Sequence, residues 1–412
     1  MTRSPTSALD RAFESWTLGP LRLRNRFIKA ATNEGMARGG VPSRALLEHH
    51  RALSAGGVGM TTLAYCAVSA DGRTFEDQVR LDEDALPALR AITDAVHGEG
   101  GAACAQITHG GAFNFLRRLS VPRPLSASGG FNAAGVISGR LFKAQMQPAD
   151  LQSVAAEFVA AARLAERAGF DAVELHMGHG YLLSQFLSPK YNRRRDGWGG
   201  DAAARARYPA EVLSRVLDAV GARLAVLCKL STVEGFRGGA GIEDSTIVAR
   251  ELSAAGAHLL VLSAGMNVES PWTIFGSKVA AAAGEHAPSL AMRAANPLLR
   301  LQEPNLQFRE LYLLETSRRI RAAVASPLAY LGGVTSAAGV ATVMAEGFDA
   351  VAMARALIHQ PQFVQALRAG VEHSGCTACN RCVGMMYTPG GTRCVLTGID
   401  RPELNRQPAQ EP

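Results

Sequence analysis

Two imidazoles and a phenol lie within six residues of one another in the segment ELHMGHGYLLSQFLSPKYNRRRDGWGG. This segment begins as a short apolar strand and places His176, His179 and Tyr181 where that strand ends. Two hydrogen-bond donors beside a weak acid suit a reaction that builds negative charge on an oxygen and then protonates the adjacent carbon. Two other roles fit the histidines: a hydrogen-bonded loop, or a zinc site, for which no third ligand is evident nearby.

Eight short apolar runs, alternating with helical patterns, provide the elements that would position these side chains. They are Arg26–Thr32, Gly59–Tyr65, Ala102–Ile107, Ala172–Leu175, Ala225–Leu230, His258–Ala264, Ser326–Leu331 and Ala350–Met353. Runs of this kind are typical of strands that are buried on both faces. Eight β/α units predict an α/β fold, a closed (β/α)8 TIM barrel in preference to an open doubly wound sheet. His176 would then lie at the carboxyl end of a barrel strand, where such folds keep their chemistry.

The helical patterns are clearest on either side of the histidine segment. One apolar stripe is formed by Leu151, Val154, Ala155, Phe158, Ala162 and Ala165, and another by Val212, Leu213, Val216, Leu217 and Val220. We expect Asp150 to cap the first helix and Gly169 to end it.

Two connections are too long for ordinary loops, Thr108–Pro148 after strand 3 and Gly265–Leu311 after strand 6. Both leave the carboxyl ends of strands, so we expect these extended loops to roof the active site. The barrel domain is predicted to span residues 1–370. Residues 371–412 form a Cys-rich C-terminal extension, whose last part, Ile399–Pro412, is expected to fray.

Composition narrows the class of protein. The chain has 412 residues, 47% of them hydrophobic, which is enough for a large core. A net charge of +7 without any run of five basic residues argues against nucleic-acid binding. No signal-peptide pattern and no long apolar stretch are evident, so we expect a cytoplasmic protein that does not enter the membrane. Of seven cysteines, Cys66, Cys104 and Cys228 are predicted to be buried small residues.

Several motifs, taken in order, resemble the old yellow enzyme family of FMN-dependent ene-reductases. They are NRFIKAATNEG, GVGMTTLAYCAVSADGR, AQITHGG, HMGHGYLLSQFLSPKYNRRRDGWGG and the late GGV…MARAL. The resemblance runs from about Leu21 to Arg368. It implies a TIM barrel that binds FMN without a covalent bond, uses NAD(P)H as reductant and reduces the C=C bond of a small α,β-unsaturated carbonyl compound.

The resemblance implies a role for each of the candidate catalytic and cofactor-binding residues. It implies that His176 and His179 grip the substrate carbonyl oxygen and that Tyr181 protonates the α carbon. Gln106 would face the flavin pyrimidine edge with its amide. Lys229 would lie near flavin N1, where a cation stabilises the anionic reduced flavin. A lysine on a buried strand is costly unless it meets an anion, which favours this role.

After strand 1 the sequence departs from the family pattern. Ala31 stands where the family often has proline, and Asn33 where Thr or Cys is commoner. The group that bonds flavin O4 is therefore open between Thr32 and Asn33. Tyr65 matches a backbone contact to the flavin and no side-chain role.

The phosphate is expected at strands 7 and 8. The resemblance assigns it to Gly332, Gly333, Val334, Ala354 and Arg355. Glycine lets the backbone approach an anion, and the helix that follows Thr335 would add a favourable dipole.

Four cysteines, spaced C-x2-C-x2-C-x11-C, lie close to the C-terminus: Cys376, Cys379, Cys382 and Cys394. They resemble the [4Fe–4S] ligands of the 2,4-dienoyl-CoA reductase and trimethylamine dehydrogenase branch. Four thiolates also suit zinc. The sequence leaves a cluster, zinc and no metal open.

Other functions remain as alternatives. The cysteine pattern suggests a flavin-dependent dehydrogenase or demethylase of amines. The histidines suggest a zinc-dependent TIM-barrel hydrolase, and a flavin sensor without catalysis is a third. Family members commonly form homo-oligomers, but the sequence fixes neither the oligomeric state, the natural substrate nor the choice of NADH or NADPH.

Overall fold

Eight parallel strands close into a barrel in the computed structural model, which describes residues 7–287, 289–397 and 402–409. In the order of their pairing the strands are β3 (Phe27–Lys29), β6 (Met60–Ala67), β7 (Ala102–Thr108), β11 (Ala172–Met177), β12 (Ala225–Ser231), β13 (Leu259–Ser263), β14 (Leu328–Tyr330) and β15 (Ala350–Met353). Each falls on one of the predicted apolar runs, and β15 pairs with β3 to close the ring. The TIM barrel is therefore confirmed.

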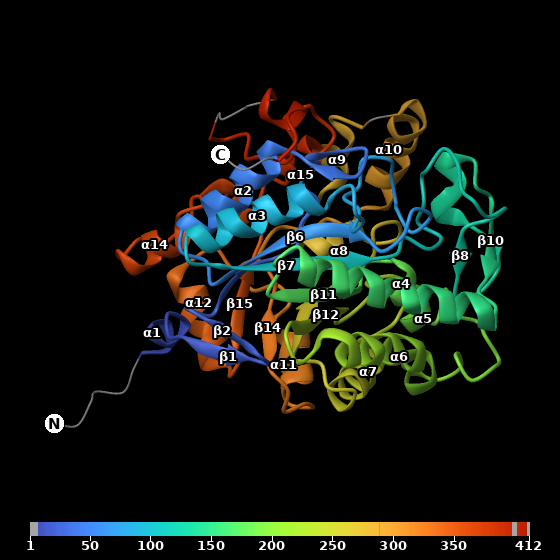
Figure 1. Ribbon diagram of the computed structural model, residues 1–412, viewed down its shortest axis with the longest axis horizontal. Helices are drawn as coiled ribbons and strands as arrows, with labels where there is room; N and C mark the ends of the chain where they lie inside the picture. The colour runs from blue at the N-terminus through green and yellow to red at the C-terminus, as the bar shows by residue number, and fades with distance from the viewer. Residues whose placement is uncertain (1–6, 288, 398–401, 410–412) are drawn as a thin grey trace.

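One helix of each connection between successive strands packs on the outside of the barrel. These helices are α2 (Arg44–Ala55), α3 (Leu86–Gly98), α4 (Pro148–Arg167), α6 (Ala202–Val220), α7 (Ile242–Ala254), α11 (Leu314–Arg321) and α12 (Ala337–Ala345). Figure 1 shows the strands between α2 and α3 on one side and α6 and α7 on the other. Short helices α1 (Ala8–Ala12), α5 (Leu182–Leu187), α13 (Arg355–His359) and α14 (Phe363–Arg368) complete this outer layer.

The core has two layers. Between barrel and helices, the apolar stripes of α4 and α6 are buried; Phe158, fully buried, would cost about 3–5 kcal/mol if cut to alanine. Inside the barrel, side chains such as Ile28 and Leu227 pack on a hairpin of β1 (Trp16–Leu18) and β2 (Leu21–Leu23).

The three predicted core cysteines, Cys66, Cys104 and Cys228, are fully buried on β6, β7 and β12. Burial raises the pKa of each thiol, so each remains protonated and acts as a small apolar residue.

The ends of α4 show one correction. The N-cap is Gln147, and Asp150 lies three residues further on, where its carboxylate accepts the backbone N–H of Gln147 (2.7 Å). Asp150 thus closes a capping box instead of standing at the cap itself. Gly169 follows the helix with a φ of +84°, as expected of a residue that ends a helix.

The two long connections carry structure of their own. After β7 come β8 (Leu125–Ser126), β9 (Gly130–Phe131), the 3-10 helix η1 (Ala133–Ser138) and β10 (Phe142–Gln145). After β13 come α8 (Pro271–Phe275), α9 (Ala280–Gly284) and α10 (Leu290–Gln302). A small hairpin, β4 (Ala37–Arg38) and β5 (Val41–Pro42), follows β3.

The Cys-rich extension packs back on the barrel through α15 (Arg381–Met385) and the 3-10 helix η2 (Leu404–Arg406), which contact α9 and α2 (Figure 1). Gly35 marks the closest approach: its φ is +62°, and a Cβ there would lie 2.1 Å from the Met386 carbonyl oxygen. The expected fraying of Ile399–Pro412 falls partly outside the described residues; within residues 402–409, Asn405 is buried and accepts a hydrogen bond from Ser43. Among the described residues no helix is long and apolar enough to span a membrane.

Candidate active site

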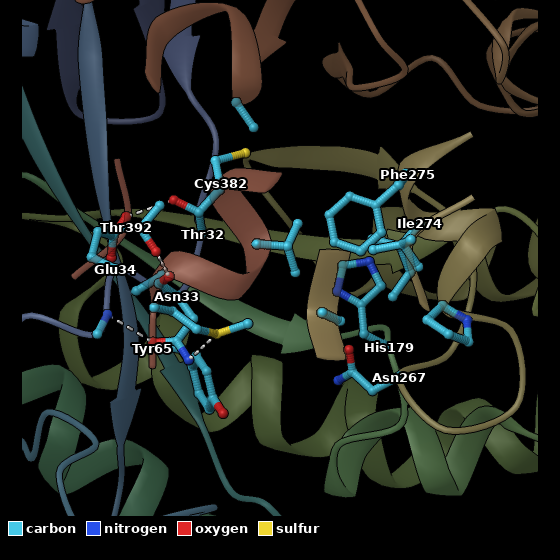
Figure 2. Close-up of a pocket in the computed structure, with 18 of the residues that line it drawn as sticks. Thr32, Asn33, Glu34, Tyr65, His179, Asn267, Ile274, Phe275, Cys382 and Thr392 are labelled. Atoms are coloured by element: carbon cyan, nitrogen blue, oxygen red, sulfur yellow. Dashed lines mark hydrogen bonds between the residues drawn. The ribbon is translucent and has the colours of Figure 1, made fainter. Parts of the chain in front are cut away.

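A cavity of about 1090 Å³ opens at the carboxyl ends of the barrel strands. Every strand contributes to its lining, at its end or just beyond: Ala30, Tyr65, Gln106, His176, Lys229, Ser263, Leu331 and Met353. Both long connections line it as well, with side chains such as Phe113 and Phe275. In Figure 2, Thr32, Asn33 and Tyr65 lie on one side of the pocket, and His179, Asn267 and Phe275 lie on the other.

His176 and His179 lie next to each other, but they bond each other instead of pointing at one common position. His176 Nε2 lies 3.0 Å from His179 Nδ1, and His179 Nε2 lies 2.8 Å from Ser263 Oγ. His176 Nδ1 is buried without a partner. The three side chains form a hydrogen-bonded row that ends in one unpaired imidazole nitrogen.

The backbone holds His179 in an uncommon conformation. Its φ is +62°, a left-handed value that costs a non-glycine residue about 1–2 kcal/mol. Two contacts fix it there: its N–H donates to Ser231 Oγ (3.4 Å), and its carbonyl oxygen accepts the N–H of Asn267 (3.1 Å). The end of β12 and the loop after β13 therefore set the position of the imidazole.

Both imidazoles are neutral. Burial, aided by the Lys229 charge, lowers the pKa of His179 to about 3, and burial lowers that of His176 well below its usual range. A neutral imidazole retains one N–H donor and one acceptor nitrogen.

Tyr181 packs against His176, with ring centroids 4.5 Å apart. Burial raises the pKa of Tyr181 to about 12, so its hydroxyl keeps its proton. The Tyr65 ring lies 5.0 Å from that of Tyr181 and lines the same cavity, so this residue presents its side chain here, which the sequence did not predict.

Gln106 and Lys229 share a buried partner that the sequence did not reveal. Glu174 Oε1 accepts from Gln106 Nε2 (2.6 Å) and forms an ion pair with Lys229 Nζ (3.1 Å). The three residues lie on the adjacent strands β7, β11 and β12. The anion that Lys229 was expected to need is thus supplied, at least in part, by the chain itself.

A second buried ion pair, Lys29–Glu34, organises the loop after β3. Thr32 Oγ1 donates to Glu34 Oε1 (2.7 Å) and lies 3.0 Å from Lys29 Nζ, so its proton is already used. Asn33 Nδ2 donates to Met386 Sδ (3.2 Å) and has a second N–H to offer. Ala31, Thr32 and Asn33 all line the cavity.

The residues expected at the phosphate are only partly brought together. Gly333, Val334, Ala354 and Arg355 line the cavity, whereas Gly332 is absent from the lining and its carbonyl oxygen accepts the hydroxyl of Tyr330 (3.0 Å).

Arg355 and the backbone N–H groups at the amino end of α12 already have hydrogen-bond partners within the chain. The Arg355 guanidinium donates to Asn380 Oδ1 (2.5 Å) and to the Phe275 carbonyl oxygen (2.9 Å). The N–H groups of Thr335 and Ser336 bond the Glu310 carboxylate (2.6 and 2.8 Å). The helix end that was expected to help bind phosphate is therefore already capped.

All four C-terminal cysteines border one small pocket beside Arg355: Cys376, Cys379, Cys382 and Cys394. Burial raises the pKa of Cys382 to about 12, and Cys394 Sγ lies 3.2 Å from His359 Nδ1. Yet within the described ranges no three ligating side chains gather as a metal site requires. A cluster or zinc at these thiols is therefore not shown, and no third ligand lies beside His176 and His179 among the described residues for the zinc-hydrolase alternative.

Sequence reasoning missed Glu174, Ser263 and Asn267 because single polar residues in or after apolar strands follow no spacing rule. A signal was present for Glu174: a carboxylate inside an apolar strand needs a buried partner, and Gln106 and Lys229 were already candidates on other strands.

Comparisons with known proteins agree on one family. Residues 11–374 match the NADH:flavin oxidoreductase / NADH oxidase family. A 4,4'-dithiodibutanoate disulfide reductase of Rhodococcus erythropolis is 39% identical over 96% of both chains. An NADH oxidase of Thermoanaerobacter brockii is 29% identical over 90% of this chain and 53% of its own length.

Among solved structures, a 2-naphthoyl-CoA reductase in complex with 2-naphthoyl-CoA superposes with a TM-score of 0.76 at 21% identity, covering 97% of this chain and 58% of that one. At this identity the likeness shows the fold alone. The match over nearly the whole chain shows that this protein belongs to the NADH:flavin oxidoreductase / NADH oxidase family and is an NAD(P)H:flavin oxidoreductase, for which the family implies FMN and a nicotinamide reductant.

Proposed function

We propose that the enzyme reduces the C=C bond of α,β-unsaturated carbonyl compounds. The observation that carries this proposal is the grouping of Tyr181, His176 and His179, all neutral, at one place in the cavity. Bound FMN, once reduced by NADH or NADPH, would supply a hydride to the β carbon. The chain must then stabilise the oxygen that becomes negative and protonate the α carbon.

The cavity residues fit FMN. An amide and a lysine, Gln106 and Lys229, suit the pyrimidine ring, while Arg355 and the backbone at Gly333, whose φ is +78°, suit the phosphate. Thr32, Asn33 and Tyr65 would border the ring system between them.

The histidines would act as N–H donors to the substrate oxygen. A carbonyl oxygen that enters between the rings would replace the bond between His176 Nε2 and His179 Nδ1. Because two neutral rings in such a bond share one facing N–H, the other ring must move its proton to the facing nitrogen before both can donate, while the Ser263 hydroxyl keeps its bond to His179 as donor or acceptor. Since the oxygen gains charge as the hydride arrives, these donors stabilise the transition state more than the bound substrate. Tyr181, with a pKa of about 12, gives up its proton only to a strongly basic carbon.

The test separates the two half-reactions. A double variant, His176→Ala with His179→Ala, should retain FMN but, after chemical reduction with dithionite, should reoxidise with an enone about 10²–10³ times more slowly than the parent. Surface His97→Ala is the control. Reoxidation by the enone at the parent rate would refute the role of the pair.

Reduction of a disulfide is a second candidate, because the relative that is 39% identical over 96% of both chains is a 4,4'-dithiodibutanoate disulfide reductase. In that reaction the hydride would go to one sulfur, the S–S bond would break, and the other sulfur would leave as a thiolate. The histidine N–H groups would face the thiolate, which is a far weaker base than a carbanion and can take its proton from water after it leaves.

Tyr181→Phe distinguishes the two reactions. Enone reduction should slow by about 10²–10⁴, because carbon needs the proton, whereas disulfide reduction should slow by less than about tenfold. A panel of enones, 4,4'-dithiodibutanoate and amines, assayed with both proteins, would also reveal the amine dehydrogenase alternative. Amine oxidation without reduction of any enone or disulfide would overturn the proposal.

A further inference from the structure

Glu174 lies behind the cavity instead of in its wall. The residue is 2% exposed and does not line the cavity, while its two partners, Gln106 and Lys229, both do. On β11, Glu174 lies two residues before His176, so the two side chains leave the same face of the strand. Any effect of Glu174 on a ligand must therefore pass through residues in front of it.

The carboxylate fixes the orientation of the Gln106 amide. A carboxylate only accepts hydrogen bonds, so the nitrogen of the amide must face it. The amide oxygen is then the end left to meet a donor in the cavity.

The same oxygen atom, Glu174 Oε1, also pairs with Lys229 Nζ (3.1 Å), and both side chains are almost fully buried. At so short a distance and away from water, the negative charge cancels part of the field that the ammonium group sends into the cavity. Of its three N–H groups, Lys229 retains two that this pair does not use.

We propose that Glu174 is a positioning residue that sets the reduction potential of the bound flavin by orienting Gln106 and partly neutralising Lys229. Reduction adds a negative charge to the flavin, which an ammonium group stabilises and a carboxylate opposes. Glu174 thus holds the potential lower than Lys229 alone would. The inference rests on FMN occupying this cavity, as proposed above.

Glu174→Gln removes the charge but keeps the shape and an acceptor oxygen for both partners. In this variant we expect reduced FMN to be favoured over oxidised FMN about tenfold more than in the parent. For a two-electron couple this equals a positive shift of about 30 mV. The measurement is anaerobic equilibration of the FMN-bound protein with a reference dye, and Asp349→Asn at the amino end of β15 is the matched carboxylate-to-amide control.

Lys229→Met provides the second arm. Without the ammonium group nothing in this pair stabilises the reduced flavin, so Lys229→Met, alone or combined with Glu174→Gln, should have a potential below that of the parent.

Each outcome decides something. A shift of less than about 10 mV in folded, FMN-bound Glu174→Gln would overturn the inference and leave the proposed function intact. If that variant fails to fold, an unchanged potential in Lys229→Met would overturn it. If no Glu174 or Lys229 variant takes up FMN while the parent does, the pair is structural and the inference fails. If the parent itself binds no FMN, the proposed function fails first.

Discussion

His179 and Tyr181 are held neutral by burial, which has a consequence for pH dependence. The pKa of His179 is lowered to about 3 and that of Tyr181 is raised to about 12, so neither group changes its charge between about pH 5 and about pH 9. We predict that the rate at which substrate reoxidises the reduced enzyme is flat over this range. Stopped-flow absorbance of the flavin would measure it. A step near pH 6.5, the ordinary pKa of histidine, would contradict the neutral pair.

Arg355 provides a second prediction for a single residue. Its guanidinium is fixed by Asn380 and the Phe275 carbonyl oxygen, and the residue lines the cavity, as Gly333 does. Arg355→Ala should weaken FMN retention at least about tenfold, since a charge-assisted hydrogen bond to phosphate is worth about 1.5–3 kcal/mol. Release of flavin on gel filtration would measure it, with exposed Arg318→Ala as the control. Parent-level retention would count against the phosphate site.

For single residues, the sequence predicted which side chains lie at the cavity but not which hydrogen bonds they form with one another. Gln106, Lys229, His176 and Tyr181 reach one cavity as expected. The partner of Lys229 was missed because hydrogen bonds between strands depend on register, and register comes from the closed barrel.

Among the elements, the C-terminal segment is fastened to the barrel by Asn405. Its side chain accepts from Ser43 Oγ (2.8 Å) and donates to the Pro389 carbonyl oxygen (2.8 Å). Asn405→Ala would remove both hydrogen bonds of this buried side chain. The free energy of unfolding should fall by about 1–3 kcal/mol. Urea denaturation would measure this against exposed Gln407→Ala, for which we expect less than about 0.5 kcal/mol. An equal effect of the two substitutions would show that the tail does not contribute to stability.

The strands were the easiest elements to predict, since eight buried apolar runs separated by amphipathic helices fit few other folds. The prediction for the start of α4 was wrong because an aspartate can stabilise a helix N-terminus from two positions, the N-cap itself or three residues after it. Asp150 was taken for the N-cap because aspartate favours that position, but Gln147 begins the helix and Asp150 reaches back to it. The tail Ile399–Pro412 is expected to fray because it is rich in Pro and Gln, and nothing in its composition predicts that Asn405 would bond Ser43 and Gly35, which lie far away in the sequence.

For the whole molecule, buried histidines predict sensitivity to acid. Burial lowers the pKa of His49 and His179 to about 3 and that of His109 to about 4. Below about pH 6.5 the unfolded chain binds protons at these residues and the folded chain does not. As the pH is lowered below about 6.5, the free energy of unfolding should therefore decrease by about 1.4 kcal/mol per pH unit for each residue.

Part of this loss is offset by surface His97, whose pKa is raised by its hydrogen bond to Asp171 and which therefore favours the folded state in acid. Urea denaturation at pH 7 and at pH 5 would measure the net change in the free energy of unfolding, which we expect to be a decrease at pH 5. Equal stability at the two pH values would contradict the burial of the three neutral imidazoles.

The central claim is that the cavity at the carboxyl ends of the barrel strands binds FMN and lets a nicotinamide reduce it. The most direct measurement is an anaerobic absorption titration of the purified protein with NADH and with NADPH, followed by quantification of the flavin released on denaturation. The account predicts a yellow protein that releases one FMN per chain and is bleached by at least one of the two nucleotides. A colourless protein that does not take up added FMN would contradict it.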